Sequence, residues 1–327
     1  MGTIQVKGSY KRVNRFLKGG GTLLDNSNDN KIITLYKEYL VSTDNKENTI
    51  LLKLRFVYLL NQYLISINKT FKTFTKENIY DYFEECLKLS WELSYQDRNK
   101  LDIKVFLNWS YINNLTKISG DMVLPKIVWH RKTNIRTYYT KEEVTKLLNV
   151  IDIRTKQGKE DYLIFSLICF LGLRISDVIN LKLSNINFNN NTISIIQYKT
   201  DNKLILPLID KVKYPLLDYL KNVRSIDTDL DYVFITTTKP YRHHTELKTH
   251  NYIVKDYLIK AGIDINGRKH GFHSLRHSFS SLLLKENTSL YSISTILGHQ
   301  DIKTTMSYLD IDTSKLKELA LEVPYVK

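Results

Sequence analysis

Basic side chains recur in the second half of the chain at predicted helix ends and turns. Arg174 lies in the run GLRISDV, where Gly172 ends a predicted helix and Asp177 can cap the next one. Lys199 lies in QYKTDNK, a predicted hairpin tip with Lys203 across the turn. A guanidinium among apolar residues needs an anion or a carboxylate to satisfy it. Arg174 therefore predicts either an internal ion pair with Asp177 or an anion site.

A third run, HSLRHSF, places His273 and Arg276 one helical turn apart on the same face. His273 and His277 have the i, i+4 spacing of a zinc site, but the zincin pattern requires Glu where Ser274 stands. Arg276 would also repel a metal ion, so we expect no metal site and no cofactor. A cation beside a proton-transfer group suits a phosphate instead.

The fourth run, LGHQDIKTTMSYL, combines a helix-ending Gly298 with His299 in the turn that follows. Asp301 can cap the next helix, and Tyr308 lies two turns along it. Each run alone has an ordinary structural interpretation, such as a solvated turn lysine or one surface tyrosine among 22.

Composition narrows the class of partner. The 327 residues include 48 Lys and Arg against 34 Asp and Glu, a net charge of +14, which is typical of proteins that bind nucleic acid or an anionic membrane surface. The longest apolar run, 162–173, is shorter than the roughly 18 residues of a membrane span. We therefore expect a cytoplasmic, nucleoid-associated protein. Cys86 and Cys169 are expected to be reduced core residues.

The first third of the chain is predicted to be a basic flexible arm followed by a helical domain. Residues 1–30 contain five Lys and Arg before the first acid, Asp25, and a run of three glycines, which is typical of a flexible basic arm. Residues 31–119 show helical periodicity, with helices over 51–67 and 98–113 and another that begins after Thr75 as N-cap. Residues 120–136 form a basic linker, whose candidate DNA-binding residues are Lys126, Arg131, Lys132 and Arg136.

The remainder, 137–327, is predicted to mix helices with three short strands. Thr140 and Glu143 form a capping box, and a helix follows over 161–171. The predicted strands are 186–188, 192–197 and 204–208, joined by turns rich in Asn and Asp. The fold class is therefore mainly α with a small antiparallel β-sheet (α+β).

The order of the four runs is more specific than any one of them. Arg, Lys, His-x-x-Arg, Gly-His and Tyr follow one another between Arg174 and Tyr308 in a basic chain. In this order and spacing the chain resembles the tyrosine recombinase (phage integrase) family over residues 137–319. The resemblance implies an N-terminal helical, SAM-like core-binding domain over 31–119 and a catalytic domain with a C-terminal tail helix over 137–327.

The resemblance also implies a role for each matching residue. Arg174 and Arg276 would bind the scissile phosphate, Asp177 would be an accessory residue, and His273 and His299 would transfer protons and hydrogen-bond the phosphate. Tyr308 would be the nucleophile. Lys199 would protonate the leaving 5′-oxygen, with Lys203 as the alternative.

The implied partner is double-stranded DNA with inverted-repeat core sites, bound by a homo-tetramer through a Holliday junction, with an accessory directionality protein. The activity would be site-specific recombination of a mobile element, without metal or ATP. A type IB topoisomerase shares the residue set and remains an alternative, as does a DNA-binding accessory protein that does not cut. A transposon, plasmid or other small-element enzyme is favoured over chromosome-dimer resolution.

Overall fold

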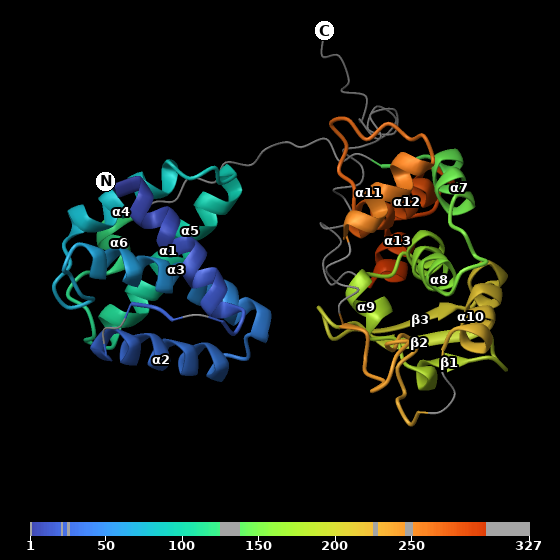
Figure 1. Cartoon of the computed structure of the whole chain (residues 1–327), viewed down its shortest axis with the longest axis horizontal. Helices are drawn as coiled ribbons and strands as arrows, with labels where there is room; N and C mark the ends of the chain where they lie inside the picture. The colour runs from blue at the N-terminus through green and yellow to red at the C-terminus, as the bar shows by residue number, and fades with distance from the viewer. Residues whose placement is uncertain are drawn as a thin grey trace, which may run out of the picture. The chain divides into compact units, whose positions relative to one another are not determined.

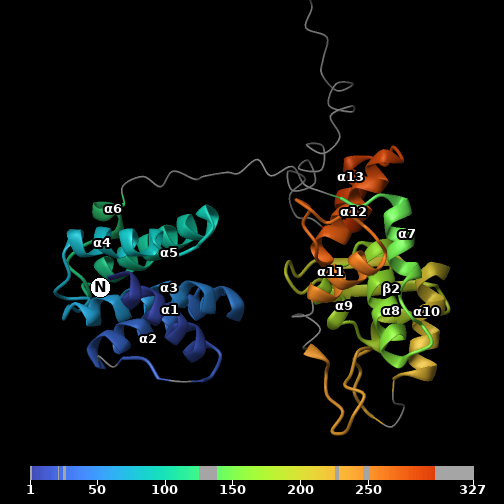
Figure 2. The same ribbon diagram turned by 45° about the horizontal axis from the view of Figure 1, so that its top comes forward.

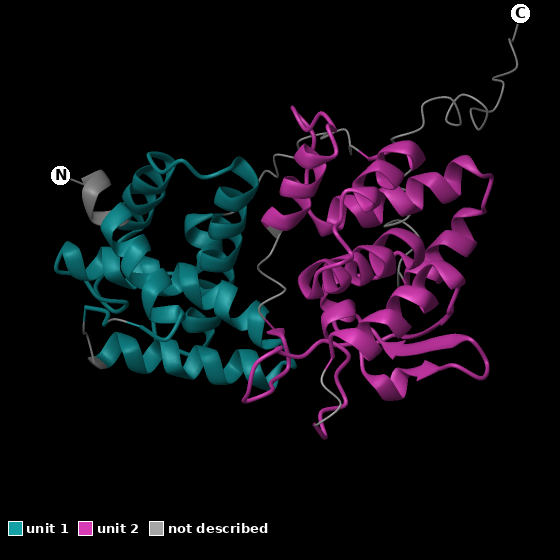
Figure 3. Ribbon diagram, turned by 45° about the vertical axis from the view of Figure 1, so that its right-hand side comes forward, with its two compact units in different colours: residues 1–133 teal, residues 134–327 magenta. Residues whose placement is uncertain are grey.

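The computed structural model describes residues 2–20, 22–24, 27–124, 138–224, 228–245 and 251–298. The chain divides into two compact units, Met1–Thr133 and Asn134–Lys327 (Figure 3). This division falls within the predicted linker over 120–136. Each unit has its own hydrophobic core, as expected of separate domains.

The first unit is helical (Figure 1). Its core is rich in aromatic side chains, and the ring of Tyr36 packs at 5.0 Å from both Phe106 and Trp109. Thr75 is the N-cap of α4, as predicted, and its N–H donates to Asn78 Oδ1 at 3.0 Å. The helices are α1 (Gly2–Leu17), α2 (Ser27–Ser42), α3 (Glu47–Ser66), α4 (Lys76–Leu87), α5 (Leu93–Ile112) and α6 (Gly120–Val123).

The prediction of a flexible arm is wrong for residues 2–17, which form α1. Tyr10, Val13 and Phe16 recur at helical spacing, and this stripe packs on the rest of the unit. Tyr10 meets Trp91 edge-on at 5.4 Å, and Phe16 meets Tyr58 at 5.2 Å. The basic residues that suggested an arm occupy the exposed faces, so the charge run concealed an amphipathic helix.

Gln62 fixes the chain that follows α1. Its buried side chain accepts from Leu24 N–H at 2.9 Å and donates to Leu24 O at 3.0 Å. Asp29, at the start of α2, accepts from Phe71 N–H at 3.1 Å. A side-chain amide that pairs with a backbone amide in this way satisfies groups that burial would otherwise leave unpaired.

The second unit has the predicted class, mainly helical with one small antiparallel sheet (Figures 1 and 2). The sheet order is β1-β2-β3, with Ile193 opposite Leu206 and Ile195 opposite Leu204, and these four side chains enter the core. The elements are α7 (Lys141–Asn149), α8 (Lys156–Leu171), α9 (Ile175–Ile179), a 3₁₀ turn (Leu183–Asn185), β1 (Ile186–Asn187), β2 (Thr192–Ile196), β3 (Lys203–Pro207), α10 (Asp210–Asn222), α11 (Asn251–Lys260), α12 (Phe272–Lys285) and α13 (Leu290–Leu297).

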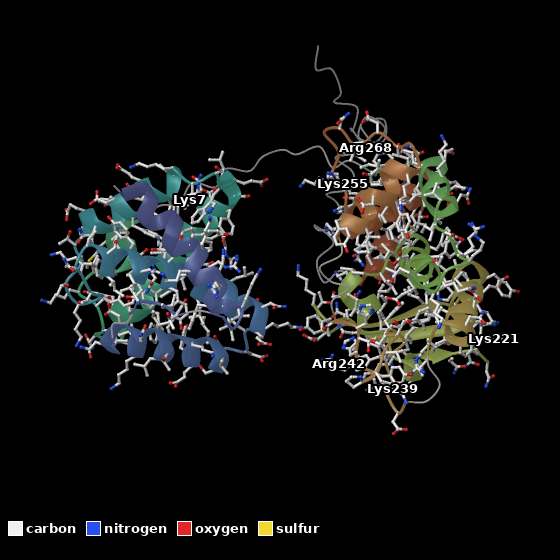
Figure 4. All side chains as sticks on the ribbon, viewed as in Figure 1. Lys7, Lys221, Lys239, Arg242, Lys255 and Arg268 are labelled. Carbon is white, nitrogen blue, oxygen red and sulfur yellow. The ribbon has the colours of Figure 1, made fainter. Side chains whose placement is uncertain are left out.

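The predicted capping box begins α7 and connects it to the loop before α12. Thr140 N–H donates to Glu143 Oε2 at 2.8 Å, and Glu143 N–H donates to Thr140 Oγ1 at 3.3 Å. Arg268, labelled in Figure 4, donates to both carboxylate oxygens of Glu143 at 2.6 and 2.9 Å and to Tyr138 O at 2.7 Å. This forked contact fixes the loop that leads into α12.

Both cysteines are buried, as predicted for core residues. Among the described residues, no helix is long and apolar enough to cross a membrane. The described ranges also hold no group of three or more His, Cys, Asp or Glu placed to bind a metal ion.

Gly172 ends α8 in the left-handed conformation, with φ at +66°. A Cβ at this position would lie 2.5 Å from Phe279 Cδ1 on α12, so glycine permits the close contact of the two helices. Gly262 has nearly the same φ, +67°, but nothing lies within 4 Å of its Cβ position. A side chain at Gly262 would therefore meet only backbone strain, whereas one at Gly172 would meet both backbone strain and steric overlap.

We expect Gly172→Ala to destabilise the second unit more than Gly262→Ala does. Both substitutions carry the cost of a left-handed alanine, roughly 1–2 kcal/mol, and overlap at Gly172 adds roughly 1–3 kcal/mol. Urea unfolding followed by circular dichroism measures the difference. Fluorescence of Trp91 and Trp109 in the first unit serves as the internal reference. Equal losses in the two variants would contradict the steric role of Phe279.

Candidate active site

Arg174 lies where α8 ends and α9 begins, and its side chain is mostly buried. Arg174 Nη1 is 3.9 Å from Asp177 Oδ2, so the two charges pair without a hydrogen bond. Both atoms are buried, and neither has a hydrogen-bond partner in the described part of the chain. A buried guanidinium nitrogen without an acceptor is unusual, and a phosphate oxygen would satisfy it.

Asp177 lies among the groups that the sequence singled out. Burial raises the pKa of its carboxyl, while the Tyr198 N–H and the charges of Arg174 and Arg276 act in the opposite direction. The Tyr198 N–H donates to Asp177 Oδ1 at 2.9 Å. Asp177 therefore joins the hairpin after β2 to the start of α9 and shares the field of both arginines.

Arg276 projects from the first half of α12 and is only 2% exposed. Its Nη1 donates to Gly172 O, and its Nη2 donates to Leu297 O at 2.9 Å. These carbonyls lie at the C-terminal ends of α8 and α13, where the helix dipole favours a cation. The backbone thus fixes the guanidinium plane beside the junction that carries Arg174.

Lys199 lies in the turn that joins β2 to β3, and its side chain is exposed. The turn is closed by two backbone hydrogen bonds, from Gln197 N–H to Asn202 O and from Asp201 N–H to Gln197 O, each 2.9 Å long. Lys203, the alternative, is also exposed and begins β3. The structure therefore keeps both lysines accessible to solvent.

His273 is the second residue of α12 and its side chain is exposed, whereas Arg276 one turn later is buried. The imidazole ring meets that of His277 edge-on, with ring centroids 4.2 Å apart. The first turn of α12 thus presents one basic group to solvent and buries the other.

Hydrogen bonds and charge join all four predicted runs, the fourth through Leu297 O, which accepts from Arg276. Arg276 contacts the helix end that precedes Arg174, and Asp177 holds the backbone of the Lys199 turn. The residues predicted at the fourth run, His299 and Tyr308, lie outside the described residues. The predicted linker contacts Lys126, Arg131, Lys132 and Arg136 also lie outside them.

Sequence reasoning missed the role of Gln197. Ile193 and Ile195 face the core on alternate positions of β2, and Gln197 continues the same alternation as a fully buried polar residue. A polar residue at an inward-facing position requires a partner. That break in the apolar pattern was the available signal.

Solved structures support the fold. The chain aligns over 97% of its length with 96% of XerH bound to palindromic difH substrate in a post-cleavage complex, at a TM-score of 0.66 and 19% identity. It aligns over 86% of its length with 95% of a chain from a lambda integrase dimer bound to a COC′ core site, at 0.66 and 15% identity. These likenesses establish the common architecture.

Sequence comparisons establish the family. The chain is 32% identical over 171 residues to y4gC of Sinorhizobium fredii, whose name describes it provisionally as an integrase/recombinase. That match covers 52% of this chain and 86% of the relative. Tyrosine recombinase XerA of Pyrococcus furiosus is 33% identical over 180 residues, or 55% of this chain and 59% of the relative. The phage integrase family model matches residues 137–315, and the chain therefore belongs to the phage integrase family of tyrosine recombinases.

Proposed function

We propose that this chain cleaves and rejoins double-stranded DNA at a specific site through a 3′-phosphotyrosyl link on Tyr308. The observation that supports this most strongly is that the charges of two mostly buried arginines, Arg174 and Arg276, both act on the Asp177 carboxylate. Arg276 is fixed by two backbone carbonyls, while Arg174 retains a buried Nη1 with no hydrogen-bond partner among the described residues. A scissile phosphate would complete the arrangement.

The two arginines stabilise the negative charge that develops on the phosphate during cleavage. A phosphodiester resists attack because it is already anionic, and its transition state concentrates negative charge on the non-bridging oxygens. Two positioned guanidiniums stabilise that charge, and in a buried site they do so more strongly than in water. Asp177 keeps Arg174 in place without a direct hydrogen bond, so the guanidinium can still donate to the phosphate.

Proton transfer accounts for the remaining groups. Tyr308 attacks phosphorus, its phenolic proton passes to a base such as His273, and the 5′-oxygen leaves with a proton from Lys199. A phenol has a pKa of about 10, so attack at neutral pH requires these neighbours. The phosphotyrosyl link conserves the bond energy, and a 5′-hydroxyl from a second duplex reverses the step.

The proposed assembly is the one that the resemblance to the family implies. We propose inverted-repeat core sites, a homo-tetramer that passes through a Holliday junction, and an accessory protein that sets direction, for a mobile element. The basic linker residues Lys126, Arg131, Lys132 and Arg136 would contact DNA phosphates. The segment 313–322 would form the C-terminal tail helix and dock on a neighbouring protomer.

The test is covalent capture on nicked suicide duplexes tiled from the DNA that flanks the gene, with EDTA present. We expect a protein–DNA adduct on one duplex that survives denaturing electrophoresis. A nick near the cleavage point releases a short fragment, so the adduct cannot be resealed and accumulates. Binding should weaken steeply with salt, because phosphate contacts release counterions.

Two other outcomes would replace the proposal. Salt-sensitive binding with no adduct on any duplex, and none on a Holliday junction built from the best-bound fragment, would favour a non-cutting accessory protein. Relaxation of a supercoiled plasmid that lacks any bound site would favour a topoisomerase-like enzyme.

A further inference from the structure

Gln197 connects two parts of the catalytic unit that lie a hundred residues apart in sequence. It follows β2 directly, and its side chain is fully buried. Gln197 Nε2 donates to Leu297 O at 3.0 Å, and Gln197 Oε1 accepts from Thr200 Oγ1 at 2.8 Å. The side-chain amide thus donates to the end of α13 through its nitrogen and accepts from the Lys199 turn through its oxygen.

The carbonyl of Leu297 is shared. It accepts from Gln197 Nε2 at 3.0 Å and from Arg276 Nη2 at 2.9 Å, so one oxygen fixes both side chains. Gly298 follows in the left-handed conformation, and a Cβ there would lie 2.4 Å from Gln197 Oε1. Only glycine therefore allows the end of α13 to approach the Gln197 amide this closely.

The Lys199 turn also has contacts besides those of the Gln197 side chain. Tyr198 N–H is held by Asp177, and Asn202 Nδ2 approaches Gly298 O at 3.5 Å, which is the limit of a hydrogen bond. Tyr198 and Lys199 themselves are exposed. Gln197, at the start of the turn, is fully buried and contacts Thr200 within it.

We propose that Gln197 is a positioning residue that sets Lys199 relative to Arg276. The inference rests on the proposed function, in which Lys199 protonates the oxygen that leaves the phosphate bound by Arg276. Proton transfer requires donor and acceptor within hydrogen-bond reach, and a shift of about 1 Å can lower a rate about 10²-fold. Because Leu297 O accepts from both Gln197 and Arg276, it fixes the position of the Lys199 turn relative to the arginine that binds the phosphate.

The test compares two leaving groups in single-turnover cleavage of the duplex that forms the adduct. In one substrate a 5′-oxygen leaves; in the other a 5′-bridging sulfur leaves as a thiolate. A thiolate is a much weaker base than an alkoxide, since a thiol has a pKa of about 8.5, so it departs without a proton from a general acid. We expect Gln197→Met to slow oxygen cleavage roughly 10- to 100-fold. Sulfur cleavage should stay within about 3-fold of wild type, because the general acid is not used there. Lys199→Ala should show the same selectivity.

Controls separate positioning from general damage. Ile205→Thr, at an exposed position on β3 of the same hairpin, should leave both rates unchanged. Thr200→Val removes the hydrogen bond from Thr200 to Gln197 and should slow oxygen cleavage selectively, but by a smaller factor than Gln197→Met. It also provides the test if the Gln197→Met variant does not fold. Equal slowing on both substrates, or no slowing on either, would overturn the inference.

Hydrogen exchange tests the same link without DNA. We expect the Gln197→Met variant to exchange amides faster across 198–202, while 192–196 and 203–207 keep their protection. Unchanged exchange in that turn would overturn the positioning role. A wild-type enzyme that cleaves neither substrate would refute the proposed function instead, and the exchange result would still decide whether Gln197 anchors the turn.

Discussion

Tyr308→Phe is expected to abolish adduct formation, with a loss of about 10³-fold or more, while DNA binding stays close to wild type. The substitution removes one oxygen and keeps the ring, so it deletes the nucleophile with little change in shape. The charges that determine salt-sensitive DNA binding are untouched. Single-turnover cleavage of the suicide duplex and a mobility-shift titration measure the two effects side by side.

The matched control is Tyr291→Phe, since Tyr291 lies on α13 with its side chain 75% exposed. This variant should cleave like wild type. The chain has 22 tyrosines, so peptide mass spectrometry of the wild-type adduct should also locate the DNA on Tyr308. A DNA-linked peptide that contains another tyrosine would reassign the nucleophile.

The catalytic unit was the more predictable half. Gly172, the Thr140–Glu143 capping box and the three strands are local signals, because turn and cap geometry depends on a few adjacent residues. Strand ends shifted by at most one residue, as in β3, which covers 203–207 where 204–208 was predicted. Such shifts leave the facing of each side chain intact when the period of two is correct.

The N-terminal arm failed for a different reason. Composition drew attention to Lys7, Lys11 and Arg12, whereas the stripe that decides the structure is apolar and sparse. This stripe stabilises the helix by packing against residues such as Trp91 and Tyr58, which lie far along the chain. Tertiary packing, and not local propensity, therefore makes α1 a helix.

The site shows the same division between local and distant information. Residue types and order indicated Arg174 and Arg276, but not that Arg276 is buried and held by Gly172 O and Leu297 O. Every residue has a backbone carbonyl, so the sequence does not indicate which carbonyls accept from Arg276. Only the polar break at Gln197 was visible in advance, and its partners were not.

Arg276→Lys is expected to lower the cleavage rate about 10²- to 10³-fold, which is the usual effect of losing one donor to a transition-state oxyanion. Lysine keeps the charge but not the planar fork, so one ammonium group cannot bond Gly172 O and Leu297 O while facing a phosphate. The free energy of unfolding should also fall by about 1–3 kcal/mol, because a buried carbonyl loses its donor. Single-turnover cleavage and urea unfolding measure the two losses.

Arg268→Lys separates these two effects. Arg268 is also an arginine with several hydrogen bonds in the second unit, held by Glu143 and Tyr138 O, and it takes no part in the proposed chemistry. Its substitution should lower stability while the cleavage rate stays near wild type. If Arg276→Lys were destabilised to the same degree but still cleaved normally, Arg276 would be a structural residue. The phosphate would then depend on Arg174, whose buried Nη1 already lacks an acceptor among the described residues.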